Sequence, residues 1–151
     1  MARPKFSVQH FIACSNAVWE GLPGSNTPRT LEGVIHRFTV APGAEPSFEF
    51  DEIWLYARFF HSNQVEGIRK FSVKIVWLDA PGGSRDVFSR PLSTVRFSNA
   101  EPIVNIAWSL RSIAFPGLGR YEFRLRTSSR NWSGPVNRIE AHEFIRIERL
   151  P

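Results

Sequence analysis

The chain has 151 residues, of which 42% are hydrophobic and 22% charged, and its formal net charge is +5. This length and composition indicate one globular domain over residues 1–151 and exclude a disordered or fibrous protein. No segment approaches the roughly 20 consecutive apolar residues of a membrane helix, and none near the first residue has the length of a signal peptide. A single cysteine, Cys14, cannot form an internal disulfide. We therefore expect a cytoplasmic protein without membrane contact.

Hydrophobic and polar residues alternate along most of the chain, and no window has the 3.6-residue period of a helix. In chain order, the alternation predicts strands near residues 5–12, 31–40, 53–61, 70–77, 87–88, 95–97, 104–110, 120–126 and 139–150. Turns rich in Pro, Gly, Ser and Asn separate them. The pattern predicts an all-β fold, an antiparallel two-sheet β-sandwich of about eight strands, of immunoglobulin-like, C2-like or jelly-roll type.

The third predicted strand, IWLYARFFH at residues 53–61, is apolar on both sides. Trp54, Tyr56 and Phe60 share one side with Arg58 between them. Because the other side is also apolar, we expect a central strand whose aromatic side chains are buried in the core of the protein. The alternative is a surface on which these rings stack against a sugar or a base, or form the centre of a protein interface.

Two segments, residues 15–30 and 127–138, are too long for simple turns and each contains a tryptophan, Trp19 and Trp132. Loops of this length are often functional. The alternative, which we favour, is that the two tryptophans fold back to cover the ends of the sandwich.

The stretch PGLGRYEFRLR places Arg120, Glu122, Arg124 and Arg126 on one side of a strand and Tyr121 on the other. The first side is expected to be the solvent-facing one. Tyr121 should lie in the core, where its hydroxyl needs a hydrogen-bond partner.

The last strand is expected to pair with this one as a hairpin. A register with Glu122 opposite Arg146 and Arg120 opposite Glu148 makes both pairs complementary in charge. A register one pair shorter sets Arg120 against Arg146, which is unfavourable. Since Arg124 then has no acidic partner, and neither has Arg126, a polyanion such as nucleic acid remains an alternative ligand.

The motifs of common enzymes and cofactor sites are missing from the sequence. The four histidines fall on different predicted strands without close ligand spacing, which gives no support for a metal. Glu49, Asp51 and Glu52 are interpreted as a solvated entry to the third strand. Cys14 has no basic neighbour to lower the pKa of its thiol. We predict no cofactor and no enzymatic activity.

Three blocks, CSNAVWEG…PRTLEGVIHRFTV, FEFDEIWLYARFF and IAFPGLGRYEFRLR, resemble in order those of a family of small bacterial proteins of planctomycete type and of unknown function. The similarity extends from about Phe6 to Leu150. The resemblance implies a stand-alone β-sandwich and no catalytic residues. The loop at 127–138 is longer than in that family.

These observations favour a non-enzymatic module that binds a protein partner or further copies of itself. Its candidate interaction residues are Trp54, Tyr56, Arg58, Arg124, Arg126, Trp19 and Trp132. A carbohydrate or other small ligand on the aromatic side chains is the second hypothesis, and a polyanion on Arg120, Arg124 and Arg126 is the third.

Overall fold

The computed structural model describes residues 6–18, 30–61, 67–98, 102–127 and 138–151. Within these ranges all regular structure is β, and there is no helix. The strands are β1 Phe6–Val18, β2 Thr30–Val34, β3 Arg37–Val40, β4 Phe48–His61, β5 Gly67–Trp77, β6 Arg85–Phe97, β7 Ile103–Phe115, β8 Gly119–Thr127 and β9 Arg138–Arg149. The all-β prediction is confirmed.

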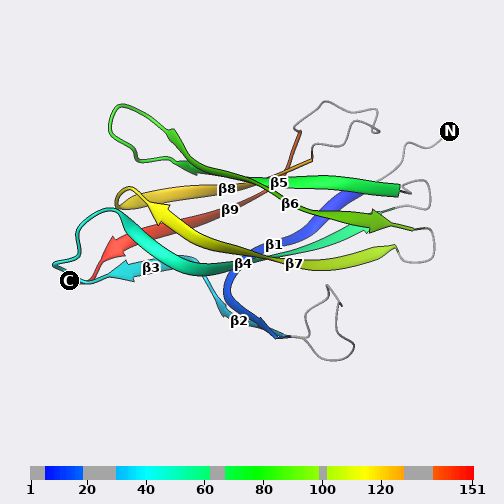
Figure 1. Ribbon diagram of the computed structural model, residues 1–151, viewed down its shortest axis with the longest axis horizontal. Coiled ribbons are helices and arrows are strands. Elements are labelled where there is room, and N and C mark those ends of the chain that lie inside the picture. The colour runs from blue at the N-terminus through cyan, green and yellow to red at the C-terminus, as the bar shows by residue number, and fades with distance from the viewer. Residues whose placement is uncertain (1–5, 19–29, 62–66, 99–101, 128–137) are drawn as a thin grey trace.

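The strands form a four-stranded sheet in the order β2-β1-β4-β7 and a five-stranded sheet in the order β3-β9-β8-β5-β6. Figure 1 shows the long strands of both sheets running along the longest axis of the molecule, with β3 beside the end of β9. Every pair of neighbours is antiparallel except β3 and β9, which are parallel. The prediction of two sheets is confirmed, but the prediction of a purely antiparallel arrangement is wrong at this pair.

The core lies between the inner faces of the two sheets and is rich in phenylalanine. Phe59 of β4 illustrates the contact between layers, because its ring centroid lies 4.9 Å from that of Phe71 on β5 and 5.8 Å from that of Phe97 on β6. Trp108 of β7 completes this cluster, 5.9 Å from Phe71. Burial of large rings at the contact of the layers is the main force holding the sheets together.

The segment predicted as one strand at residues 31–40 is two strands in different sheets. Gly33 has a φ of +62°, a conformation that side chains disfavour, and its Cα lies close to the Ser15 side chain. The last hydrogen bond to β1 is donated by the Ile35 N–H to the Ala13 carbonyl. At the next residue the chain joins β9, because the His36 carbonyl accepts from the Arg146 N–H. The mixed polarity of both sides of this segment reflects the change of sheet.

The two short segments predicted around Pro91 are one strand, β6. A proline cannot donate a backbone hydrogen bond and is tolerated mainly at the edge of a sheet. Among the described strands β6 has a neighbour on one side only, and its register with β5 shifts between Lys70 and Ser72, next to the Ser72–Pro91 pair.

The predicted register of the last hairpin is wrong. Arg120 lies opposite Arg146, and Glu122 lies opposite Phe144. The unfavourable arginine pair is tolerated because each guanidinium binds a different acid: Arg120 Nη2 is 2.8 Å from Asp79 Oδ1, and Arg146 Nη1 donates to Glu148 at 3.4 Å.

Candidate functional site

Four side chains project from the outer face of β4, and we call them the aromatic row: Trp54, Tyr56, Arg58 and Phe60. The strand alternates, so that the residues between them, among them Leu55 and Phe59, are fully buried in the core. The first three members of the row are partly exposed, and Phe60 is 38% exposed. The expectation that this side of the strand is buried in the core is therefore wrong, because only the other face of the four-stranded sheet is covered by the second sheet.

Glu52 fixes one end of the aromatic row. The Trp54 indole Nε1 donates to Glu52 Oε1 at 2.7 Å, and the Ser109 hydroxyl donates to Glu52 Oε2 at 2.9 Å. Arg111 Nε donates to the same oxygen at 3.2 Å. These contacts, led by the Ser109 hydrogen bond, hold the pKa of the Glu52 carboxyl below its ordinary value. Glu52 is partly exposed at this entry to the strand, and it also anchors Trp54, a role that the sequence did not predict.

The middle of the aromatic row is also fixed in orientation. The Tyr56 hydroxyl donates to Asn105 Oδ1 of β7 at 2.6 Å, and partial burial raises the pKa of this phenol. Arg58 lies between His10 of β1 and Asn105 of β7 in the sheet. In the part of the chain that the structure describes, the Arg58 Nε atom is buried and has no hydrogen-bond acceptor.

Apolar residues of the neighbouring strands widen the aromatic row into a patch. Ile12 of β1 lies opposite Tyr56, and Ile103 of β7 lies opposite Phe60 and is 37% exposed. Cys14 lies opposite Trp54 but is fully buried, so its thiol is not a surface nucleophile. The outer face of β1, β4 and β7 therefore carries an apolar and aromatic patch with the Arg58 side chain in its middle.

The basic candidates lie on the other sheet, away from the aromatic row. Arg124 projects from β8, where its Nε donates to Glu122, and His142 Nδ1 lies 3.0 Å from the second oxygen of the same carboxylate. Glu122 is only 8% exposed, so the prediction that it is solvent-facing is wrong, as is the prediction that Arg124 has no acidic partner. Arg126 is partly exposed two residues further along β8.

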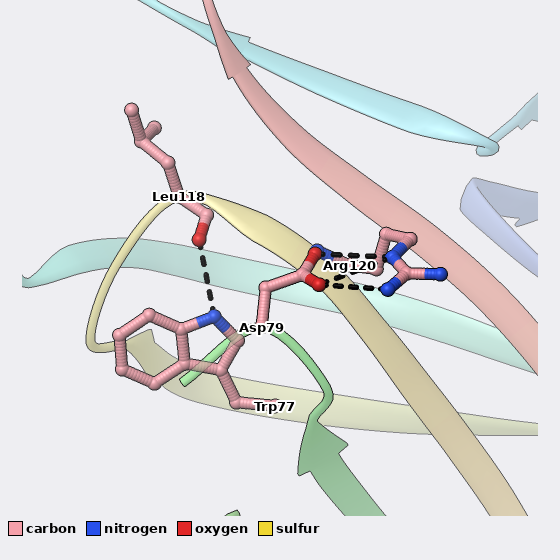
Figure 2. Close-up of polar contacts among 4 residues, drawn as sticks. All are labelled: Trp77, Asp79, Leu118 and Arg120. Carbon is pink, nitrogen blue, oxygen red and sulfur yellow. Dashed lines mark hydrogen bonds and ion pairs between the residues drawn. The ribbon is translucent and has the colours of Figure 1, made fainter. Parts of the chain in front are cut away.

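Arg120 is bound at the corner where β5 leads into the next turn (Figure 2). Its guanidinium and its backbone N–H both donate to Asp79, the backbone bond at 2.7 Å. These bonds lower the pKa of the Asp79 carboxyl to about 2. Beside them the Trp77 indole donates to the Leu118 carbonyl at 3.0 Å, so that the pair belongs to a structural corner.

The seven candidate residues do not form one site. Trp54, Tyr56 and Arg58 come together on the four-stranded sheet, Arg124 and Arg126 lie on the five-stranded sheet, and Trp19 and Trp132 lie outside the described residues. Sequence reasoning missed Glu52, Asn105 and Ser109 as the residues that orient the aromatic rings. Each is a polar residue in an ordinary strand alternation, and their role depends on which strands are neighbours, which the sequence does not state.

The one hollow described below lies apart from the aromatic row. A shallow hollow of about 330 Å³ is lined by Ser47, Arg85, Asp86, Val87, Ala114 and Pro116, none of which belongs to the aromatic row. In the described part of the chain no three residues among His, Cys, Asp and Glu gather as metal ligands. Within the described ranges of the chain, no helix is long and apolar enough to cross a membrane.

No family model and no curated protein matches the chain. Among solved structures it is similar to a β-glucosidase from Listeria innocua in complex with isofagomine, with a TM-score of 0.48 and 6% identity. It is also similar to a β-D-glucoside glucohydrolase from Trichoderma reesei, with a TM-score of 0.47 and 14% identity. Both alignments cover 97% of this chain, but only 16% and 19% of the respective enzymes. The chain thus spans less than a fifth of the length of either.

Proposed function

We propose that this chain is a non-enzymatic binding module and that the aromatic row is its docking surface for a protein partner. The observation that carries the proposal is that Trp54, Tyr56 and Arg58 project from the face of β4 that the second sheet does not cover. Trp, Tyr and Arg are the residue types that contribute most of the binding energy in protein interfaces. Large apolar side chains gathered on an outer face mark such surfaces.

The hydrogen bonds of the row support binding because they fix the rings before a partner arrives. Trp54 is held by Glu52 and Tyr56 by Asn105. A side chain that is already ordered loses less conformational entropy on association. The partly exposed guanidinium of Arg58 places a cation beside the rings, for which a carboxylate of the partner is the natural counterion.

The shape of the surface favours a protein over a small ligand. Sites for small ligands are usually concave, whereas the aromatic row lies on a sheet face and contributes no residue to the hollow described above. The carbohydrate hypothesis is retained as the alternative, with Trp54 and Tyr56 as stacking residues. The polyanion hypothesis is weaker, since Arg120 and Arg124 are each bound to an acid within the chain.

The experiment passes a native cell extract over three immobilised proteins and compares the proteins that each retains. The three are wild type, the Trp54→Ser/Tyr56→Ser double variant, and Phe144→Ser. Phe144 is the matched control, because it is 54% exposed on the other sheet. We expect a stoichiometric protein to be retained by wild type and Phe144→Ser and lost from the double variant, with the same order of affinities for the purified pair by calorimetry. A partner that binds all three equally would contradict the proposal.

The alternative is tested with the same three proteins by affinity electrophoresis in gels that contain soluble β-glucans and xylans. We expect equal mobility with and without polysaccharide for all three. If polysaccharide slowed the migration of wild type but not that of the double variant, the ligand of the aromatic row would be a carbohydrate and not a protein.

Of the three sandwich types named from the sequence, we favour the immunoglobulin-like one. The order β1-β4-β7 corresponds to strands A, B and E of that fold, and the order β9-β8-β5-β6 corresponds to G, F, C and C′. Tyr121 supports the assignment, since it lies near the start of β8, the counterpart of strand F, and its hydroxyl donates to the carbonyl of Gly117 four residues earlier. A tyrosine in this place is a hallmark of the fold.

A further inference from the structure

The edge of the four-stranded sheet at β7 is a second surface that is open to association. Among the described strands, β7 pairs with β4 on one side and with none on the other. Alternate residues of such a strand direct their backbone N–H and C=O groups away from the sheet. These groups form a template on which a further strand can pair.

The other sheet edges carry features that discourage strand addition, and β7 does not. β2 and β3 have only 5 and 4 residues, and β6 contains Pro91, several charges and two register shifts. Short strands, prolines, charges and bulges are the usual means by which proteins protect their sheet edges. β7 has 13 residues, IVNIAWSLRSIAF, without proline or lysine, and Arg111 is its one charged residue.

The usable length of this edge is set by Ser112. Its φ of 55° is a left-handed conformation that interrupts an extended strand. The continuous extended segment is therefore residues 103–111, and the residue at its midpoint is Ala107.

We propose that a second copy of this chain pairs with β7 through its own β7, antiparallel, with a two-fold axis at Ala107. Full overlap of residues 103–111 then places Asn105 opposite Ser109 and Ile106 opposite Trp108 of the other copy. Both pairs match in polarity, and the axis falls on a small side chain. The two Arg111 side chains stand at opposite ends of the pairing, roughly 27 Å apart at 3.4 Å per residue, so no like charges meet.

The self-complementarity of this segment selects a second copy as the occupant. With the axis at Ala107, Val104 and Ile106 meet Leu110 and Trp108 on the core side, and each Arg111 meets Ile103 rather than another charge. A two-fold axis perpendicular to the sheet also keeps both aromatic rows on one face, so that the dimer presents two docking surfaces to a partner. The inference concerns a different surface from the proposed function, and either can fail without the other.

Light scattering after size-exclusion chromatography tests the dimer with a charge placed on the axis. Wild type should form dimers at high micromolar concentration, whereas in Ala107→Lys two lysines meet at the axis and the dimer should weaken roughly tenfold or more. Thr39→Lys is the control: it adds the same charge on an exposed position of β3, opposite Glu148, and should leave the dimer unchanged. Circular dichroism verifies that each variant is folded. A wild type that is monomeric at these concentrations would overturn the proposal.

Disulfide cross-linking tests the register. In antiparallel strands the Cβ atoms of directly opposite residues lie about 5 Å apart, within reach of a disulfide after small adjustment. Ala107→Cys should therefore form a covalent dimer on mild oxidation. Ser109→Cys is two residues away on the same edge, and its copies should be roughly 14 Å apart, too far to bridge. The native Cys14 is fully buried and gives a low background. Equal cross-linking of both variants, or of neither, would contradict a two-fold axis at Ala107.

Discussion

Tyr121 combines complete burial with two hydrogen bonds to one residue. Its hydroxyl donates to the Gly117 carbonyl at 2.6 Å and accepts from the Gly117 N–H at 3.2 Å, and burial raises the pKa of the phenol to about 12. The sequence predicted the buried ring and the need for a partner, and both are confirmed. The partner itself lies only four residues away, in the turn before β8.

We expect Tyr121→Phe to lower the free energy of unfolding by about 1–3 kcal/mol, because it leaves buried backbone groups of Gly117 without a partner. Tyr56→Phe serves as the control, since it removes a partly exposed hydroxyl and should cost at most about 1 kcal/mol. Urea unfolding followed by fluorescence measures both. Equal losses would show that the corner around Gly117 finds other hydrogen bonds.

The Asp79–Arg120 pair predicts a specific acid sensitivity. The pKa of Asp79 is lowered from 3.8 to about 2, first by the hydrogen bonds of the Arg120 side chain. A lowered pKa in the folded state means that the ionised carboxylate stabilises the fold above about pH 4, and that this contribution is lost as the pH falls through about 2.

Thermal unfolding of wild type and Asp79→Asn between pH 4 and pH 2 checks this dependence. The melting temperature of Asp79→Asn should fall less over this interval than that of wild type. Arg120→Gln should have the same effect, because it removes the main cause of the lowered pKa. Parallel curves for all three proteins would show that the pair does not govern this part of the acid response.

At the level of elements, the pairing of β8 with β9 depends on Glu122. This largely buried carboxylate accepts from Arg124 on its own strand and lies 3.0 Å from His142 on β9. Its partners are thus Arg124 and His142, and not Arg146, which charge complementarity had predicted from the sequence. The observed register is therefore fixed by a partly buried polar cluster and by the apolar inner faces of both strands, and the exposed ion pairs follow it.

Glu122→Ala should lower the free energy of unfolding by about 1–3 kcal/mol, because hydrogen bonds to a charged group are lost in a largely buried place. Glu148→Ala provides the comparison: its contacts with Arg37 and Arg146 are at the surface and should contribute at most about 1 kcal/mol. Chemical denaturation at pH 7 distinguishes them. A larger loss for Glu148→Ala would mean that surface ion pairs set the register after all.

For the whole molecule, the contrast between the two faces of β4 is the decisive feature. Phe59 and Phe60 are neighbours in the sequence, yet Phe59 is fully buried between the layers and Phe60 is 38% exposed on the outer face. We expect Phe59→Ala to cost about 3–5 kcal/mol, which is enough to unfold a marginally stable domain. Phe59→Leu should remain folded with a smaller loss, and Phe60→Ala should cost at most about 1 kcal/mol.

The midpoints of urea unfolding for these three variants show how much stability each face of β4 loses when its ring is truncated. A loss for Phe60→Ala as large as that for Phe59→Ala would contradict the outer position of the aromatic row. Because the proposed docking surface is on that face, the same result would also remove its structural basis.

The sequence by itself determined the all-β character, the two-layered arrangement and most strand positions. The reason is physical: a strand with one buried face must alternate, and turns require Gly, Pro, Asn or Ser, so both features are local and readable along the chain. Tyr121 was assigned to the core correctly on this basis.

Only the tertiary structure decided which apolar face is covered, which strands are neighbours and in what register. Both faces of β4 look alike in the sequence, and the buried one is simply the one that meets the second sheet. The anchoring of Trp54 by Glu52 and Ser109 joins residues 57 positions apart, and that of Tyr56 by Asn105 joins residues 49 apart. Such contacts depend on the order of strands in a sheet, which is settled by the packing of the whole chain and not by any local pattern.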